Sequence, residues 1–248
     1  MKIANGVEML ELEMSIMGQT SMIHPTLLYD DTTAILVDVG IPGQLKEIQA
    51  AMDKAGVPFA NLQAVILTHQ DIDHVGSIEE VLDVKGGNID VYAHAEDKPY
   101  IEGDKEPIKL NRAQVEQMLA NMPAEMRKQA EAMLLNRPTA KVTQVVEDGT
   151  ILPFFGGITV IFTPGHTPGH ISLYLQASKT LITGDALVSE NGKVLGPNAQ
   201  ATPDMGEAIA SMQKFLNFDI EKVICYHGGL CADNVNQQLR ELAQTLTQ

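Results

Sequence analysis

Four side chains that can bind a metal ion lie within one short segment of the sequence, residues 68–77 (THQDIDHVGS). They are His69, Asp71, Asp73 and His74. The segment directly follows residues 62–67, an apolar run that predicts a strand, and a loop at a strand end can direct several side chains at one point. This density of imidazole and carboxylate groups favours a metal site over a solvated polar loop.

Three further segments place a histidine or an aspartate at or just beyond the end of a predicted strand. They are TPGHTPGH at residues 163–170, TGD at 183–185 and YHGG at 226–229, and their candidate residues are His166, His170, Asp185 and His227. Five of the seven histidines therefore follow strands in polar, glycine-rich surroundings. Histidines buried in a core would instead be scattered along the chain. The pattern predicts one site assembled from several strand ends.

The elements that must position these residues are apolar runs rich in β-branched residues, which alternate with helical patterns. Strands are predicted at residues 33–39, 62–67, 89–93, 141–146, 157–163, 171–175, 180–183 and 222–226. Helices are predicted at residues 42–55, 75–84, 204–216 and 234–246. Two β-rich halves flanking a helical stretch suggest two sheets covered by helices on both outer faces, an α/β fold in a single domain, 1–248.

Strand signals stop between about residues 95 and 137, where 111–122 and 123–135 are predicted helices with breaks at Asn111 and Pro123. Four methionines fall in this stretch: Met118, Met122, Met126 and Met133. One interpretation is a helical hairpin packed on the domain, with methionine filling gaps in the packing. The other is a lid that offers a deformable apolar surface to a substrate.

Composition excludes several classes of function. The chain has 248 residues, with 32 acidic against 17 basic side chains and a formal net charge of −15, so it lacks the cationic surplus that a nucleic-acid partner requires. No apolar run approaches about 18 residues and no signal peptide is evident, which predicts a cytoplasmic protein with no membrane partner. Cys225 and Cys231 are predicted to be buried free thiols. We expect a small-molecule substrate, and a homodimer is an open alternative.

Taken together, the candidate residues resemble the metallo-β-lactamase superfamily of metal-dependent hydrolases. The family pattern is a His-x-His-x-Asp-His loop, a later His in a Gly-His-Thr-like context, an Asp after Gly, and a last His before Gly. The matching positions here are His69, Asp71, Asp73, His74, His166, Asp185 and His227. The resemblance implies a four-layer αβ/βα sandwich, with residues 95–137 as a lid-like helical insertion.

The resemblance also implies a dinuclear site for divalent metal ions, with zinc expected first. Metal one would be held by His69, Asp71 and His166, and metal two by Asp73, His74 and His227. Asp185 would bridge the two ions, and Asp73 and Asp185 are the expected catalytic residues. Asp38 (in LVDVG) and His170 would support the ligands from behind, although Asp38 could equally be a capping residue at a turn.

Asp71 departs from the family pattern, which has histidine at this position. A third carboxylate lowers the net charge of the site and shifts its preference from zinc toward manganese or iron. Because aspartate is shorter than histidine, the alternative is that Asp71 reaches metal one poorly and that this site is weak or empty.

The function implied by the resemblance is hydrolysis of an ester, lactone or thioester of a small molecule through a metal-bound hydroxide. The TPGHTPGH segment resembles the lactonase and glyoxalase II branches. Only 21 residues follow His227, too few for the C-terminal helical domain of glyoxalase II, so a lactone or acyl ester is the preferred expectation. The alternatives are an iron-dependent oxidoreductase acting on persulfides and a non-catalytic metal-binding scaffold.

Overall fold

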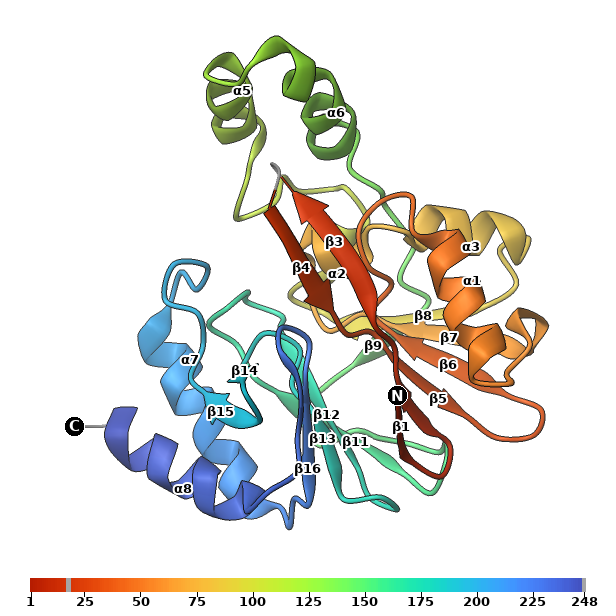
Figure 1. Ribbon diagram of the computed structural model, residues 1–248, viewed down its shortest axis with the longest axis vertical. Helices are drawn as coiled ribbons and strands as arrows, with labels where there is room; N and C mark the ends of the chain where they lie inside the picture. Colours follow the sequence, from red (N-terminus) through yellow and green to blue (C-terminus); the bar gives the residue numbers. More distant parts are fainter. Residues whose placement is uncertain (17–18, 247–248) are drawn as a thin grey trace.

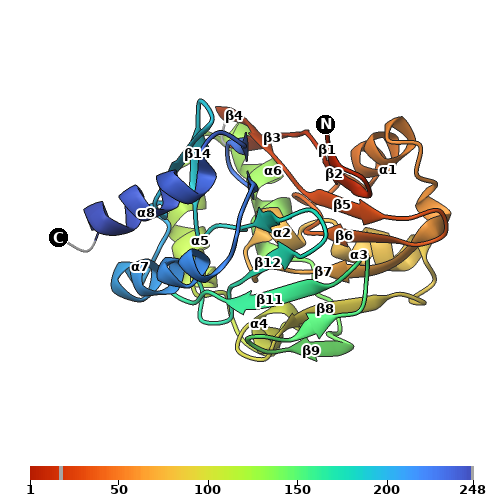
Figure 2. The same cartoon turned by 90° about the horizontal axis from the view of Figure 1, so that it is seen from below.

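Two β-sheets stack face to face, and helices cover both outer sides (Figure 1). The computed structural model describes residues 1–16 and 19–246. Helices α7 (Met205–Met212) and α8 (Val235–Leu246) lie on one outer side, and α1 (Leu45–Lys54) lies on the opposite side (Figure 2). The predicted four-layer αβ/βα sandwich is therefore confirmed.

The first sheet has the strand order β1-β2-β5-β6-β7-β8-β9. Its strands are β1 (Lys2–Ala4), β2 (Val7–Met9), β5 (Thr26–Tyr29), β6 (Ala34–Val37), β7 (Leu62–Ile66), β8 (Asp90–His94) and β9 (Gln144–Val146). Strands β6 to β9 are parallel, so their carboxyl ends meet at one edge of the sheet. The connections include α1, the 3-10 helix η1 (Phe59–Asn61), α2 (Ile72–Val75) and α3 (Ile78–Val84).

The second sheet has the order β10-β11-β12-β13-β16-β17. Its strands are β10 (Ile151–Leu152), β11 (Ile158–Phe162), β12 (Ile171–Leu175), β13 (Thr180–Ile182), β16 (Lys222–Cys225) and β17 (Gly229–Cys231). Strand β13 runs parallel to β16, and residues 176–179 join the antiparallel strands β12 and β13. Two separate hairpins complete the strands: β3 (Leu12–Ile16) with β4 (Gln19–Ile23), and β14 (Val188–Glu190) with β15 (Lys193–Leu195).

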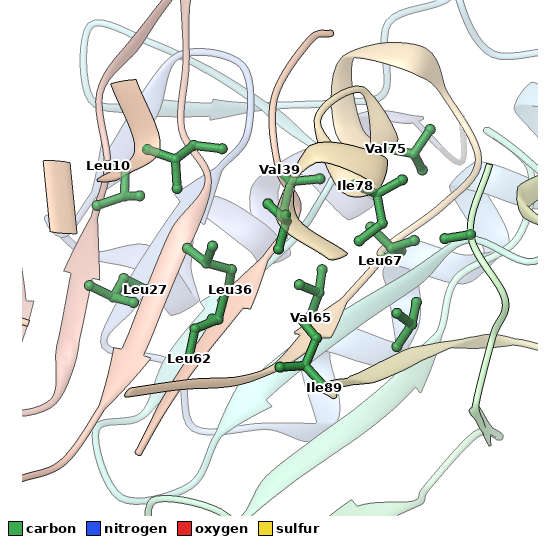
Figure 3. Close-up of a cluster of buried hydrophobic side chains, with 14 of the residues drawn as sticks. Leu10, Leu27, Leu36, Val39, Leu62, Val65, Leu67, Val75, Ile78 and Ile89 are labelled. Carbon is green, nitrogen blue, oxygen red and sulfur yellow. The ribbon is translucent and has the colours of Figure 1, made fainter. Parts of the chain in front are cut away.

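Three layers of buried apolar side chains hold the four structural layers together. Alternation along β6 sends Leu36 toward Ile48 of α1 and Ile78 of α3, whereas Ile35 faces the second sheet. Figure 3 shows part of the first of these layers. The third layer packs the second sheet against α7, α8 and the 3-10 helix η2 (Gln213–Asn217), where Phe215 is fully buried. The two outer layers each cover one sheet face, and the middle layer joins the inner faces of both sheets, so each sheet is packed on both sides.

The helical insertion lies between β8 and β9 and contains α4 (Lys98–Ile101), α5 (Arg112–Ala120) and α6 (Ala124–Leu135). Helices α5 and α6 stand apart from the sandwich at the top of Figure 1. Helix α5 begins at the predicted break, where Asn111 Oδ1 accepts the Gln114 amide at 3.1 Å and Gln114 Oε1 accepts the Asn111 amide at 3.0 Å. Helix α6 carries Met126 and Met133, whose side chains lie outside the described parts of the chain.

Three predicted boundaries are wrong. Instead of one helix at residues 75–84, α2 and α3 are separated at Gly76 and Ser77, so Asp73 and His74 lie on a short helix and not in a loop. The cause is a close backbone approach: the Gly76 amide donates to Gly40 O at 2.8 Å, and a Cβ on Gly76 would lie 2.3 Å from the Ile41 carbonyl carbon.

In the other two cases the element in the structure is shorter than the predicted one. The predicted strand at residues 141–146 shortens to β9: the Thr143 amide still donates to Val91 O at 3.0 Å, but the Val91 amide donates to Thr143 Oγ1 and not to a backbone carbonyl. The predicted helix at residues 204–216 tightens into η2 after Met212.

Two predictions made from composition can be compared with the structure directly. Cys225 and Cys231 are buried free thiols, as expected. None of the helices in the described residues is both long and apolar enough to cross a bilayer.

Candidate metal centre

The structure brings all seven predicted ligands together at the carboxyl ends of β7, β11, β13 and β16. Their ligand atoms form three overlapping groups, and within each group the atoms lie within 4.8 Å of one another. The groups are His69, Asp71 and His166; His69, His74 and Asp185; and Asp73, His74 and His227. The first and third groups are the triads expected for metal one and metal two.

The donor atoms of this cluster fit a metal ion. Among the described residues, three of them are buried without a hydrogen-bond partner: His69 Nε2, His74 Nε2 and Asp185 Oδ1. His74 Nε2 and Asp185 Oδ1 lie 3.3 Å apart without hydrogen-bond geometry. A buried polar atom left unpaired costs about 1–3 kcal/mol, and imidazole nitrogen with carboxylate oxygen is a donor set that divalent ions prefer. A bound cation would satisfy all three atoms at once.

On the metal-two side, His227 lies at the edge of the cluster. Its Nε2 is 3.2 Å from Asp73 Oδ2 and 3.5 Å from Asp185 Oδ2. Burial lowers the pKa of His227, but the carboxylates of Asp185 and Asp73 outweigh burial and raise the pKa to about 10. The pKa of His74 is also raised well above its ordinary value, because Asp185, Asp38 and Asp73 outweigh burial. This side has the strong negative potential that a cation requires.

On the metal-one side, Asp71 reaches both histidines despite its short side chain. Asp71 Oδ2 lies 3.3 Å from His69 Nε2 and 3.1 Å from His166 Nε2. Burial raises the pKa of Asp71, but His69, His166 and Lys109 outweigh it and hold the pKa well below its usual range. Lys109 is a residue that sequence reasoning missed, and its ammonium group contacts the Asp71 carboxylate.

Asp38 supports the cluster from behind through the end of β7. Its Oδ1 accepts the Thr68 amide at 2.8 Å, and its Oδ2 accepts the Thr68 hydroxyl at 2.7 Å and His74 Nδ1 at 2.8 Å. With Nδ1 donating to Asp38, the neutral ring that would bind a metal ion has its Nε2 lone pair toward the cluster. Asp38 adopts a positive φ of 62°, so it occupies a tight turn and orients a histidine at the same time.

Both ring nitrogens of His170 form hydrogen bonds within the protein. Its Nε2 accepts the Asp185 amide at 3.0 Å, and its Nδ1 lies 2.8 Å from Thr163 Oγ1. Burial and the neighbouring His166 hold the pKa of His170 well below its ordinary value, which fits a neutral ring that donates at Nδ1 and accepts at Nε2. His170 therefore positions the Asp185 backbone and does not point a free nitrogen at a metal ion.

Asp97 is a second residue that sequence reasoning missed. It is 1% exposed and accepts four hydrogen bonds: Gln70 N at 2.8 Å, Gln70 Nε2 at 3.2 Å, Thr167 Oγ1 at 2.7 Å and Gly169 N at 2.7 Å. Burial raises its pKa, opposed by these hydrogen bonds. Gln70 lies in the first ligand loop, and Thr167 and Gly169 lie in the loop of His166. One buried carboxylate thus joins two ligand loops, and its place three residues after β8 is the only local signal for it.

A cavity of about 850 Å³ opens over the cluster. Its floor includes Asp71, Asp73, His166, Asp185 and His227. Its walls come from the insertion, through Ile108, Lys109, Leu110 and Gln114, and from Ile72, Val188, Asn198, Gln200, Ala201 and Pro203. No methionine of the described chain is among these lining residues. The volume is that of a small-molecule site.

The fold and the cluster together define a metal-binding α/β protein, and comparisons with known proteins agree. The sequence profile described as "Metallo-beta-lactamase superfamily" matches residues 20–227. The chain is 30% identical over 226 residues to "Probable metallo-hydrolase YflN" of Bacillus subtilis (strain 168), covering 86% of this chain and 82% of that protein. This protein therefore belongs to the metallo-β-lactamase superfamily, and its His and Asp cluster is the metal-binding cluster of a metallo-hydrolase.

Solved structures show the same fold. The metallo-beta-lactamase family protein TTHA1429 from Thermus thermophilus superposes with a TM-score of 0.73 at 22% identity, covering 98% of this chain and 80% of that one. The BLEG-1 B3 metallo-beta-lactamase superposes with a TM-score of 0.68 at 22% identity, covering 98% of this chain and 100% of that one.

Proposed function

We propose that this protein is a metal-dependent hydrolase that cleaves an ester, lactone or thioester of a small molecule. The observation that carries the proposal is the position of the unsatisfied ligand atoms. His69 Nε2, His74 Nε2 and Asp185 Oδ1 belong to the cluster that forms the floor of the cavity. A cation held there would lie beside any substrate that entered.

Divalent metal ions bound at the cluster would supply Lewis acidity, making a water more acidic and polarising the carbonyl oxygen of the substrate. The chain's own residues have separate roles. Asp73 Oδ2 lies at the cavity floor, where it can accept a hydrogen bond from the attacking water and hold that water toward the substrate. Asp38 and His170 keep His74 and Asp185 in position.

The walls favour a substrate with an apolar part. Ile108 and Leu110 of the insertion face the same cavity as Ile72 and Val188 of the sandwich. These aliphatic side chains suit an acyl chain or the ring of a lactone. The insertion therefore contributes to substrate binding as a lid would, through Ile108 and Leu110, whereas Met118 and Met122, the two methionines of this stretch with described side chains, do not line the cavity.

The metal preference separates this proposal from a second one. The cluster has three carboxylates, those of Asp71, Asp73 and Asp185. A carboxylate-rich site suits manganese or iron better than a histidine-rich site does. Zinc remains our expectation for the hydrolase. An iron-dependent oxidoreductase acting on persulfides is the second candidate, favoured by Asp71.

One experiment tests both candidates. The metal content of the purified protein is measured, and turnover is followed with lactones, thioesters, p-nitrophenyl esters, phosphodiesters, β-lactams and a persulfide with dioxygen. We expect ester, lactone or thioester hydrolysis that is lost after chelation and restored by metal, and that is absent in Asp73→Asn. An iron-containing, coloured protein with persulfide-dependent oxygen uptake and no hydrolysis would overturn the hydrolase in favour of the second candidate.

A further inference from the structure

We infer that the ammonium group of Lys109 occupies the metal-one position, so that the protein holds one metal ion tightly on the His74 side and admits a second only by displacing Lys109. The observation behind this inference is that Lys109 Nζ lies between Asp71 and His166. These are two of the three residues expected to hold metal one. The inference rests on the proposed metal chemistry of the cluster but not on the identity of the substrate.

The contacts of Lys109 use its whole donor capacity. Its ammonium donates to the Asp71 carboxylate, to His166 Nε2 at 2.7 Å and to Ala201 O at 3.0 Å. A lysine ammonium has three N–H donors, and here each donor has an acceptor. The side chain is 20% exposed and that of Asp71 is 17% exposed, so the pair is largely removed from water. A charge-assisted contact of this kind is stronger than one at an exposed surface.

The unsatisfied atoms of the cluster belong to one group of ligands, His69, His74 and Asp185, although His69 is also one of the residues expected to hold metal one. Among the described residues no atom of Asp71 or His166 is unsatisfied, because both side chains accept from the Lys109 ammonium. A cation is therefore required on the side of His74 and Asp185, and the side of Asp71 already holds one in Lys109. A divalent ion coordinated by Asp71 and His166 would repel the ammonium and compete with it for the same two acceptors.

This arrangement gives a physical reason for the departure at position 71. A neutral histidine could accept a hydrogen bond from an ammonium but could not neutralise its charge, whereas the Asp71 carboxylate does both. Asp71 and Lys109 are thus a matched pair, one from the ligand loop and one from the insertion. A histidine at position 71 would suit a metal ion, and an aspartate suits a metal ion or a lysine.

The segment that carries Lys109 is tied to the ligand loop on one side and has a strained backbone on the other. The Ile108 amide donates to Gln70 Oε1 at 3.3 Å, which joins the segment to the first ligand loop. Leu110, on the other side of Lys109, is 45% exposed and adopts a positive φ of 55°, a conformation that is costly for a leucine. Displacing Lys109 would disturb this segment and the cavity wall that Ile108 and Leu110 form, so metal loading and the cavity wall are coupled.

Metal stoichiometry tests the inference without any substrate. Wild type, Lys109→Met, Lys109→Ala and the control Lys105→Met are saturated with zinc, dialysed against metal-free buffer and measured by elemental analysis, with isothermal titration for affinities. Lys105 is an exposed lysine of the same insertion, lying over the Tyr100 ring. We expect one equivalent in wild type and Lys105→Met. In both Lys109 variants we expect two, with an affinity at the second site at least about tenfold higher than in wild type.

The outcomes are distinguishable. Two tightly held equivalents in wild type, or no gain in folded Lys109 variants, would overturn the inference and leave the proposed hydrolase intact. No metal bound to any of the four proteins would overturn the proposed function as well. The two Lys109 variants differ in retained side-chain bulk, so a folding defect in one, detected by circular dichroism, leaves the other to decide.

Discussion

The two halves of the molecule supply the candidate metal cluster in different ways. The first half places four ligands within one segment after β7, of which Asp73 and His74 share a single helical turn. The second half supplies His166, Asp185 and His227 from the ends of three strands that are far apart in the sequence. The first contribution is local and the second depends on the assembly of a sheet.

A different buried aspartate supports each of these two contributions. Within the first half, Asp38 binds Thr68 and His74, which belong to one segment. Between the halves, Asp97 binds Gln70 from one side and Thr167 and Gly169 from the other. Asp38 therefore orients a ligand, whereas Asp97 joins two loops that no local interaction would bring together. Substitutions at these residues should therefore separate metal affinity from fold stability.

The largest effect is expected from Asp185→Asn, because Asp185 touches ligands from both halves. Its carboxylate lies 3.3 Å from His74 Nε2 and 3.2 Å from His166 Nε2. Loss of this charge should reduce metal affinity and turnover by more than the roughly 10- to 100-fold typical of residues that only support a ligand. Metal titration and kcat/KM check this, with Asp219→Asn, an exposed partner of Lys179, as the control. Unchanged metal content in Asp185→Asn would remove Asp185 from the cluster.

The next effect is a loss of stability in Asp97→Asn. An asparagine keeps one acceptor oxygen but presents an amide group to two of the four donors, leaving them unpaired in a buried site. We expect the free energy of unfolding to fall by about 3 kcal/mol, measured by urea denaturation. A loss below that of Asp38→Asn would contradict the role of Asp97 in joining the halves.

Asp38→Asn should lower the free energy of unfolding less than Asp97→Asn does and should mainly reduce metal affinity. Asparagine tolerates the positive φ of 62° at this position and can still accept from Thr68 Oγ1 and His74 Nδ1, so only the Thr68 amide loses its acceptor. We expect a stability loss of about 1–2 kcal/mol and a fall in metal affinity of roughly 10- to 100-fold. If metal affinity is unchanged while stability falls as far as in Asp97→Asn, the two aspartates have the same role and the comparison fails.

The same contrast between local and non-local structure explains what the sequence predicts. Strands β6, β7, β11 and β12 are apolar runs bounded by turn residues, and Asn111 is a local cap, so each is visible within a few residues. The seven candidate ligands follow strands or lie in one short motif, and the resemblance to the superfamily orders them. The four-layer arrangement follows from two β-rich halves and their amphipathic helices.

Other elements have weaker or more distant signals. The strands of residues 1–29 are three to five residues long with mixed composition, and β14 and β15 are equally short. Two of these hairpins still had a usable signal, the Asn-Gly pairs at residues 5–6 and 191–192, where Gly6, Asn191 and Gly192 adopt positive φ. Lys109 had none, because its contacts with Asp71 and His166 depend on the path of the whole insertion and not on neighbouring residues.

The smallest effect tests the support on the second-half side alone. A chain of hydroxyl groups links His170 to β13: Thr163 Oγ1 lies 2.8 Å from His170 Nδ1 and 3.1 Å from Ser172 Oγ, and Ser172 donates to Thr183 O at 3.0 Å. Ser172→Ala should lower the free energy of unfolding by about 1 kcal/mol, because Thr163 loses one partner and the Thr183 carbonyl loses the Ser172 donor. The matched control is Ser21→Ala, at an exposed position of β4, which should change neither stability nor metal affinity.

Metal affinity in Ser172→Ala shows how far this support extends toward the cluster. His170 would still accept the Asp185 amide and donate to Thr163, so metal affinity should change less than in Asp38→Asn, where the residue touches a ligand directly. A fall in affinity as large as that of Asp38→Asn would mean that the second-half ligands depend on a single hydrogen-bonded chain. The non-local half would then be held as tightly by one network as the local half is by Asp38.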